Sequence, residues 1–292
     1  MAEIKSQKQK ENQDEEIVSM QENILGEHAD LSADFGHHAA GDAVVKVLEI
    51  SKDFVLGSTT VNILKKVSFE IKRGEFVMLI GPSGCGKSTL LHTIYGLEPP
   101  TSGSIYVEDE SIWDHTKNWR AFFRNQYIGF IPQQAFWIKS LSVIENVAIP
   151  GFIGGRGYRE SVERAYKTLE IVGMKEWAHY RPFDLSGGQQ QKVAFARSLL
   201  LNPKFIIADE PTGNLDQKSG VQLMDLIKNF NEKFGITVLM VSHNADQFHY
   251  ATRAVKMVDG EIISDLNNED DFSVSEVPAQ NNQNTNAEKN EV

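Results

Sequence analysis

The sequence predicts an α/β fold built around a mostly parallel sheet, and three short, continuous apolar runs are the main observations behind this prediction. The runs span residues 76–80, 205–208 and 238–241. Strands that are buried on both faces have this composition, because they lack the alternation of a half-exposed strand. Polar residues follow the runs, so we expect polar groups to collect at the carboxyl edge of the sheet, where open α/β folds bind ligands.

Two further regions surround this predicted core. Residues 44–50 and 67–71 read as short strands and residues 72–75 read as a turn, which predicts an antiparallel β subdomain. Apolar side chains within residues 159–172 fall at helical spacing, and we predict a helical subdomain over roughly residues 115–187. The expected architecture therefore has a parallel core, an antiparallel β subdomain and a helical subdomain.

Charge divides the chain into one folded domain and two acidic tails. The chain has a net charge of -11, and residues 1–42 hold ten acidic side chains against three lysines. Residues 265–292 hold seven acidic side chains against one lysine, so residues 43–264 are close to neutral. Both tails are polar and poor in aromatic residues, and we expect them to be disordered. Nothing in the domain resembles the basic stripe of a nucleic-acid-binding protein, so we expect no nucleic-acid partner.

The chain carries no sign of a membrane-spanning or exported protein. No apolar run approaches the roughly 20 residues of a spanning helix, and the polar N-terminus lacks the apolar stretch of a signal peptide. Cys85 is the only cysteine, which fits a reducing compartment. We therefore expect a cytoplasmic protein.

A phosphate-binding motif follows the first apolar run. The eight residues from Gly81 to Ser88 match G-x-x-x-x-G-K-[ST] and are followed by Thr89, between a predicted strand and a predicted helix. The glycines allow backbone N–H groups to surround the phosphates of ATP, Lys87 reaches the β- and γ-phosphates, and Ser88 is a ligand for Mg²⁺. Cys85 contributes only its backbone. The predicted nucleotide contacts here are Gly81, Ser83, Gly84, Cys85, Gly86, Lys87, Ser88 and Thr89.

Two carboxylates and a histidine follow the other two runs. Asp209 and Glu210 end a buried strand, where adjacent carboxylates are costly unless they meet a cation or water. We expect Asp209 to hold Mg²⁺ through a water and Glu210 to deprotonate the attacking water. His243 ends the next strand and could donate to the γ-phosphate. A single histidine is more often a core or surface residue, and the position beside the other motifs favours the functional role.

A family resemblance emerges from a third motif, residues 185–189, which read Leu-Ser-Gly-Gly-Gln and resemble the ABC signature. Together with the motif order, it makes residues 43–264 resemble the nucleotide-binding domain of ABC transporters, a P-loop NTPase fold. In that family two domains face head to tail, and the signature of one covers the phosphates bound by the other. The motifs in order are residues 81–89, Gln133, residues 185–189, Asp209-Glu210, residues 214–216 and His243.

The resemblance implies further site residues. Ser186, Gly187, Gly188 and Gln189 would contact the nucleotide of a second copy, and Asp216 would join the dimer contact. Gln133 would contact Mg²⁺ or water and sense a membrane partner. Phe54 lies where the family often has a tyrosine that stacks on adenine, and a core aromatic at a strand end is the alternative.

The segment from Ala208 to Asp216 resembles the branch that serves lipoprotein release, macrolide and peptide export, and FtsE-like cell division. Members of that branch act on four-helix membrane proteins. The resemblance implies an ATPase on the cytoplasmic membrane face that powers export or extraction of a lipoprotein, peptide or drug-like substrate. The alternative is an FtsE-like ATPase that switches a membrane scaffold and controls cell-wall hydrolases.

Two interpretations remain open at this point. Residues 136–138 follow Gln133, where the family docks its membrane partner, and they form either that apolar groove or the core of the helical subdomain. Soluble ABC proteins of DNA repair, chromosome structure and translation are a third functional class. Those proteins usually carry long coiled coils, zinc modules or a second cassette, and this sequence shows none of them.

Overall fold

The computed structural model describes residues 42–267, so the predicted disorder of residues 1–41 and 268–292 lies outside the described part. At the C-terminal boundary the prediction was three residues short, because strand β10 continues to Asn267. Its Asp265 accepts from Arg253 Nε on β9 at 2.6 Å. This side-chain pairing, added to the backbone pairing of β9 with β10, draws residues 265–267 into the sheet.

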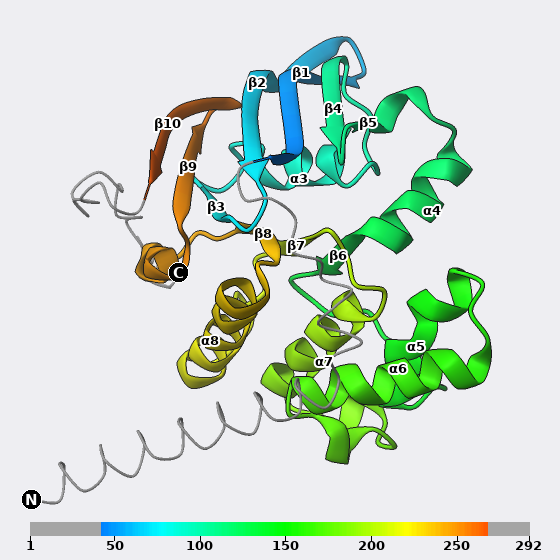
Figure 1. The fold of residues 1–292 in the computed structure, drawn as a ribbon. Coiled ribbons are helices and arrows are strands. Elements are labelled where there is room, and N and C mark those ends of the chain that lie inside the picture. The colour runs from blue at the N-terminus through cyan, green and yellow to red at the C-terminus, as the bar shows by residue number, and fades with distance from the viewer. Residues whose placement is uncertain (1–41, 268–292) are drawn as a thin grey trace, which may run out of the picture.

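A six-stranded sheet forms the centre of the molecule, in the order β10-β9-β3-β8-β7-β6 (Figure 1). Neighbours among β9, β3, β8, β7 and β6 pair in parallel, and β10 is antiparallel to β9. The three apolar runs are confirmed as the adjacent strands β3, β8 and β7. The strands of this sheet are β3 (Phe76–Ile80), β6 (Ile128–Ile131), β7 (Phe205–Asp209), β8 (Thr237–Val241), β9 (Arg253–Val258) and β10 (Glu261–Asn267).

Strand β6 is a correction to the predicted helical subdomain of residues 115–187. Its four residues lie inside that range, yet they pair in parallel with β7 at the edge of the sheet. Gly129 lets β6 pack closely against α7, because a Cβ there would lie 2.9 Å from the Ser198 carbonyl oxygen. The chain therefore leaves the sheet region, returns to it as β6, and leaves again.

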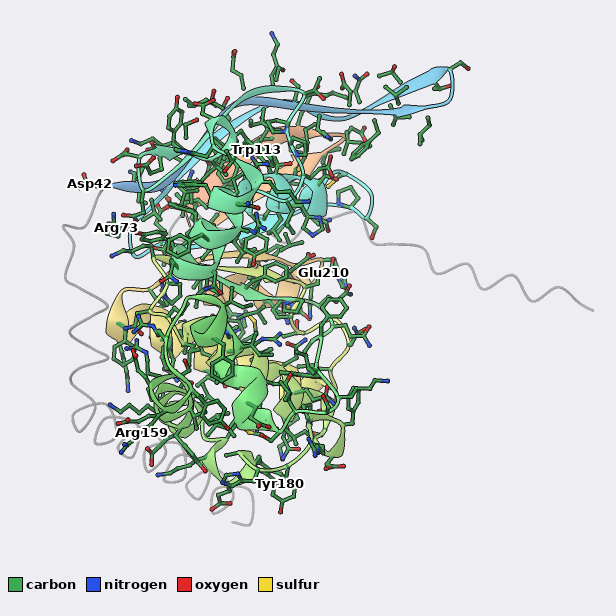
Figure 2. All side chains as sticks on the ribbon, turned by 90° about the vertical axis from the view of Figure 1, so that its right-hand side faces the viewer. Asp42, Arg73, Trp113, Arg159, Tyr180 and Glu210 are labelled. Atoms are coloured by element: carbon green, nitrogen blue, oxygen red, sulfur yellow. The ribbon has the colours of Figure 1, made fainter. Side chains whose placement is uncertain are left out.

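A second, four-stranded antiparallel sheet has the order β2-β1-β4-β5. It confirms the predicted antiparallel subdomain, but its first two strands are 14 residues long and far exceed the predicted strands. Their outer halves form a hairpin that projects from the body of the molecule (Figure 2). The strands are β1 (Ala43–Leu56), β2 (Thr59–Lys72), β4 (Ser102–Val107) and β5 (Glu110–Ser111).

The helices cover the two faces of the central sheet. Side chains alternate along β3, so Phe76, Met78 and Ile80 join one apolar cluster while Val77 and Leu79 join the other. The first cluster packs against α5 to α8, and the second packs against α3 and the antiparallel sheet (Figure 1). The α-helices are α3 (Lys87–Ile94), α4 (Lys117–Tyr127), α5 (Val143–Ile153), α6 (Tyr158–Ile171), α7 (Gly187–Leu199) and α8 (Gln217–Phe234).

Four short 3₁₀ segments complete the described fold: η1 (Ile112–Asp114), η2 (Lys175–Trp177), η3 (Pro182–Asp184) and η4 (Ala245–Tyr250). Within residues 42–267, none of the helices combines the length and the apolar composition that crossing a membrane requires. The carboxyl ends of β3, β7 and β8 lie side by side, which brings the motifs that follow them to one edge of the sheet.

Candidate functional site

The loop between β3 and α3 leaves backbone donors available for an anion. Gly86 is the N-cap of α3 with φ 104°, and neither a side-chain cap nor an acidic residue occupies the first turn of the helix. The N–H groups at a helix N-terminus have no intrahelical acceptors, so this end suits a phosphate. Glycine is required at Gly81, where φ is +155° and a Cβ would lie 2.0 Å from the Met257 carbonyl oxygen. The loop therefore fits the phosphates of a nucleotide.

Lys87 lies across this loop. Its buried ammonium donates to the carbonyl oxygens of Gly81 at 2.8 Å and Pro82 at 2.9 Å. Cys85 is buried behind it, with its sulfur 3.9 Å from Lys87 Nζ. The positive charge is thus held within the loop by main-chain oxygens, and the cysteine side chain is directed into the protein core, as expected for a residue that contributes only its backbone.

Asp209 and Ser88 form the part of the site that suits a divalent cation. Burial raises the pKa of Asp209, and the charges of His92 and Lys87 and a hydrogen bond with Ser88 act in the opposite direction. A hydroxyl next to a carboxylate provides the hard oxygen donors that Mg²⁺ prefers. No cluster of three or more His, Cys, Asp or Glu residues suitable for a metal occurs within residues 42–267. An ion here would therefore need phosphate and water oxygens to complete its coordination.

Glu210 lies between two other predicted site residues. Its Oε1 is 3.3 Å from Nδ1 of His243, and its Oε2 accepts from Nε2 of Gln133 at 3.2 Å. The His243 side chain is 56% exposed, so it is not a core histidine. Glu210 has φ 45°, a left-handed conformation that costs a non-glycine residue of order 1–3 kcal/mol and is concentrated at functional sites. Figure 2 places Glu210 at the junction of the β-rich and helical parts.

Gln191 holds the Gln133 loop in place, and the sequence analysis did not identify it. Its side-chain amide is buried in α7 and donates to the carbonyl oxygens of Pro132 at 3.1 Å and Gln133 at 2.8 Å. Gly213 leaves room for the loop, since a Cβ there would lie 3.1 Å from Gln133 Nε2. The sequence signal that could have identified Gln191 is a polar amide side chain at a helix position surrounded by buried residues.

We predict that Gln191→Leu lowers kcat roughly tenfold or more, because losing two hydrogen bonds of about 1 kcal/mol each releases the Gln133 backbone. KM for ATP should change little, since Gln191 does not contact the phosphate loop. Steady-state ATPase assays separate the two parameters. In a Gln133→Ala background, Gln191→Leu should lower kcat little further. If the losses in kcat of the two single variants were fully additive in the double variant, Gln191 would not act through Gln133.

The signature residues build a helix cap. Ser186 Oγ accepts from Gln189 N at 3.3 Å, and Gln189 Oε1 accepts from Ser186 N at 2.9 Å, which is a capping box at the start of α7. Gly188 lies against α8, where a Cβ would be 2.7 Å from Ser219 Cβ. No described hydrogen bond or ion pair joins these residues to the phosphate loop of the same chain.

Asp216 also caps a helix. Its Oδ1 accepts from Ser219 N at 3.0 Å at the start of α8, and hydrogen bonds with Ser219 hold the pKa of Asp216 below its ordinary value. Ser219 therefore lies between Asp216 and Gly188, which connects the segment at 214–216 to the signature. The two motifs form one surface at the N-termini of α7 and α8.

Phe54 lies on the projecting hairpin of β1 and β2. Its side chain is 36% exposed and Lys52 Nζ lies 4.7 Å from the ring centroid, so the core-aromatic alternative is wrong.

Residues 136–138 do not all fit one of their two interpretations, the exposed apolar groove or the core of the helical subdomain. Phe136 is 76% and Ile138 is 49% exposed, whereas Trp137 packs inward and donates from Nε1 to Gln190 Oε1 at 2.9 Å.

Comparisons with known proteins agree with this geometry. A family model described as ABC transporter matches residues 64–213, just over half of the chain. An uncharacterised ABC transporter ATP-binding protein of Methanocaldococcus jannaschii is 44% identical over 224 residues, which cover 77% of this chain and 100% of that protein. The chain belongs to the ABC transporter family. It is the ATP-binding subunit type of that family and an ATPase.

Two named relatives indicate the branch of this ABC ATPase. The lipoprotein-releasing system ATP-binding protein LolD of Geobacter metallireducens is 37% identical over 76% of this chain and 99% of its own length. The macrolide export ATP-binding/permease protein MacB of Vibrio parahaemolyticus is 37% identical over 78% of this chain but only 35% of its own length. The resemblance to the LolD and MacB branch is therefore confirmed.

Solved structures confirm the ABC ATPase fold. One is the dimeric post-hydrolysis state of an ATP-binding cassette, bound to ADP and Pi, from Methanocaldococcus jannaschii. It matches with a TM-score of 0.71 and 38% identity over 76% of this chain and 98% of that chain. ATP binding and hydrolysis by this ABC ATPase follow from the family.

Proposed function

We propose that this ABC ATPase powers a separate membrane permease of the four-helix type, in export or extraction of a lipoprotein, peptide or drug-like substrate. Two copies would bind two ATP molecules between them at the cytoplasmic face of the cell membrane. The LolD and MacB relatives support the branch, and the dimeric relative bound to ADP and Pi supports the paired arrangement.

The observation that carries the proposal is the division of the site. Glu210, Gln133 and His243 are assembled at the sheet edge beside the phosphate loop, whereas the Ser186 end of α7 has no described contact with that loop. A helix N-terminus with an adjacent hydroxyl is an anion-binding element. In the proposed dimer, Ser186, Gly187, Gly188 and Gln189 reach the γ-phosphate bound to the second copy, and Asp216 joins the contact.

The residues of one copy have the following proposed roles. Backbone N–H groups at Gly84 and Gly86 surround the phosphates, and Lys87 turns from the Gly81 and Pro82 carbonyls towards them. Glu210 takes a proton from the attacking water, Gln133 orients that water, and His243 donates to the γ-phosphate. Phe54 stacks on adenine through its exposed ring. Ser88, Asp209 and Gln133 would hold Mg²⁺, which supplies positive charge at the β- and γ-phosphates when bound.

An exposed apolar patch beside Gln133 supports the membrane partner. Phe136, Ile138, Tyr180 and Phe183 are between 49% and 76% exposed. Their two segments are tied together, because Val143 N donates to the Tyr180 carbonyl oxygen at 2.9 Å. Contiguous exposed apolar side chains mark interaction sites. We propose that this patch, Phe136, Ile138, Tyr180 and Phe183, contacts the cytoplasmic part of the permease.

The test is purification of the full chain from membranes of its host in mild detergent, with identification of the integral membrane protein that accompanies it. Lys139 lies 5.4 Å from the Phe183 ring centroid, and Lys139→Glu should weaken that complex and its coupled ATPase activity. Nucleic-acid-stimulated ATPase activity, or an unaffected complex, would contradict the proposal. Chained cells after gene deletion, without lipoprotein or drug defects, would favour the FtsE-like role.

A further inference from the structure

Gln247 lies in η4 and binds two segments of the site at once. Its Nε2 donates to Thr212 Oγ1 at 2.8 Å, and its Oε1 accepts from Ser242 Oγ at 2.9 Å. Thr212 follows β7 and Ser242 follows β8, so one side chain spans the ends of two neighbouring strands. An amide suits this position because it carries a donor and an acceptor on one planar group. Gln247 therefore joins the segment that carries Glu210 to the segment that carries His243.

Ser242 fixes the start of the His243 segment. The serine is buried, its N–H donates to the Leu79 carbonyl oxygen at 3.3 Å, and its hydroxyl accepts from Asn244 N at 3.1 Å. His243 lies between Ser242 and Asn244, and its side chain is 56% exposed. Packing alone therefore does little to hold the histidine ring. The Ser242 hydroxyl, which Gln247 binds, determines how this segment turns.

Thr212 holds the other segment. Residues 210–213 form a turn in which Gly213 N donates to the Glu210 carbonyl oxygen at 3.0 Å. Glu210 has a left-handed φ of 45°, and such a conformation persists only where the surrounding contacts fix it. Thr212 lies inside this turn and packs against α8, because a Cβ at Gly220 would be 3.7 Å from the Thr212 Cβ. A hydrogen bond at the Thr212 hydroxyl therefore helps to fix the turn that orients Glu210.

The contact between Glu210 and His243 depends on both anchors. Glu210 Oε1 lies 3.3 Å from His243 Nδ1, and the two residues belong to separate segments. Such a contact is kept only while both segments hold their positions, and a misplacement of about 1 Å can cost about 10²-fold in rate. Among the described hydrogen bonds, none joins Gln247 to Glu210 or His243 directly. Its effect on them therefore passes through Thr212 and Ser242.

We propose that Gln247 is a positioning residue for ATP hydrolysis, which holds the His243 ring against the Glu210 carboxylate. This inference rests on the proposed roles of Glu210 and His243. It goes further by assigning the geometry of that pair to a residue outside the sequence motifs. Because Gln247 also lies outside the phosphate loop, it affects turnover rather than ATP binding.

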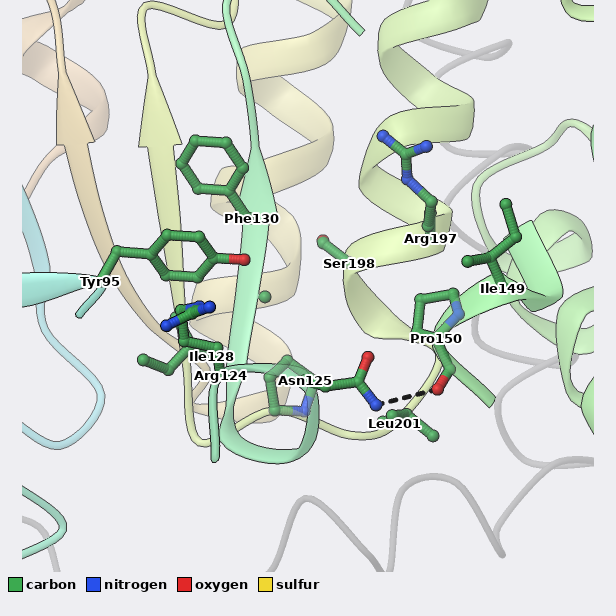
Figure 3. A pocket seen from close by; sticks show the side chains of 12 residues that line it. Tyr95, Arg124, Asn125, Ile128, Phe130, Ile149, Pro150, Arg197, Ser198 and Leu201 are labelled. Atoms are coloured by element: carbon green, nitrogen blue, oxygen red, sulfur yellow. Dashed lines mark hydrogen bonds between the residues drawn. The ribbon is translucent and has the colours of Figure 1, made fainter. Parts of the chain in front are cut away.

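The test compares Gln247→Leu with Asn125→Leu in the full chain. Both positions hold half-buried amides that join two segments, but Asn125 Nδ2 donates to the Pro150 carbonyl oxygen at 2.9 Å, between α4 and α5 (Figure 3). Gln247→Leu should lower kcat about 10- to 100-fold and leave KM for ATP nearly unchanged, whereas Asn125→Leu should turn over like wild type. Gln247→Asn should show the same loss, because the shorter amide cannot reach both partners and introduces no apolar surface.

A second measurement follows the His243 ring itself. In NMR spectra of the histidine rings of the full chain, the signal that disappears in His243→Ala identifies this residue. That signal should shift in Gln247→Leu and stay unchanged in Asn125→Leu. Thr212→Val removes one of the two hydrogen bonds and should also lower kcat. The double variant of Thr212→Val and Gln247→Leu should lose little more than Gln247→Leu alone.

Three results would each overturn the inference: wild-type kcat in Gln247→Leu, an unmoved His243 signal, or losses of Thr212→Val and Gln247→Leu that multiply in full. An equal loss of kcat in Asn125→Leu would also overturn it, because the effect would then be one of general packing. The proposed function stands in these cases if Glu210→Gln and His243→Ala still lose turnover. If those two variants hydrolyse ATP like wild type, the proposed roles fail and the inference fails with them.

Discussion

Glu210→Gln is expected to lower kcat about 10² to 10⁴-fold, which is the usual contribution of general base catalysis. The amide keeps the shape of the side chain, and it can still contact Gln133 and His243, which lie 3.2 and 3.3 Å from the carboxylate oxygens. It cannot accept a proton from water. Affinity for ATP should remain close to that of wild type, because Glu210 is not part of the phosphate loop. Phosphate release at saturating ATP and equilibrium nucleotide binding measure the two quantities.

Glu232→Gln is a matched control for this substitution. Glu232 is 58% exposed on α8 and forms an i,i+4 ion pair with Lys228, away from the site. Its turnover should equal that of wild type. Undiminished turnover in Glu210→Gln would remove Glu210 from the catalytic role.

Lys87→Ala is expected to weaken ATP binding by roughly 10- to 100-fold, since hydrogen bonds to charged groups contribute about 1.5–3 kcal/mol. The ammonium is held inside the phosphate loop at Gly81 and Pro82, within reach of any phosphate bound there. Removing it takes away the only charged side chain of that loop. Equilibrium titration with a fluorescent ATP analogue measures the change.

Lys117→Ala supplies the comparison, because Lys117 is exposed at the start of α4 and outside the loop. Thermal unfolding of both variants shows whether the loss of two main-chain hydrogen bonds at Lys87 affects the fold. Normal ATP affinity and hydrolysis in Lys87→Ala would refute the assignment of the phosphate site.

The parallel core was predictable because its strands are buried on both faces. All five residues of β3 and all five of β8 are buried, and continuous apolar runs are the direct result. Strand β6 was missed because four residues inside the predicted helical subdomain carry too little periodicity to separate a strand from a helix. The outer half of the β1 and β2 hairpin was missed because its side chains are mostly exposed, so burial imposes no apolar pattern there.

The assembly of the site was predictable only in part. Glu210 and His243 follow two neighbouring predicted strands, so parallel pairing alone brings them to one edge. Gln133 follows β6, which the sequence analysis did not predict, and its role was implied only by the family resemblance. Gln191 and Arg197 act through main-chain oxygens of a loop distant in sequence. Such contacts depend on how α7 packs against that loop, and no local spacing encodes them.

In the proposed assembly, one chain holds half of an ATP site and ATP joins two copies. The most direct measurement is the molar mass of the full-length Glu210→Gln variant in solution, with and without saturating ATP and Mg²⁺. Binding without hydrolysis should trap the paired state, so we expect a monomer without nucleotide and twice the monomer mass with ATP. A monomer that persists at saturating ATP would contradict it.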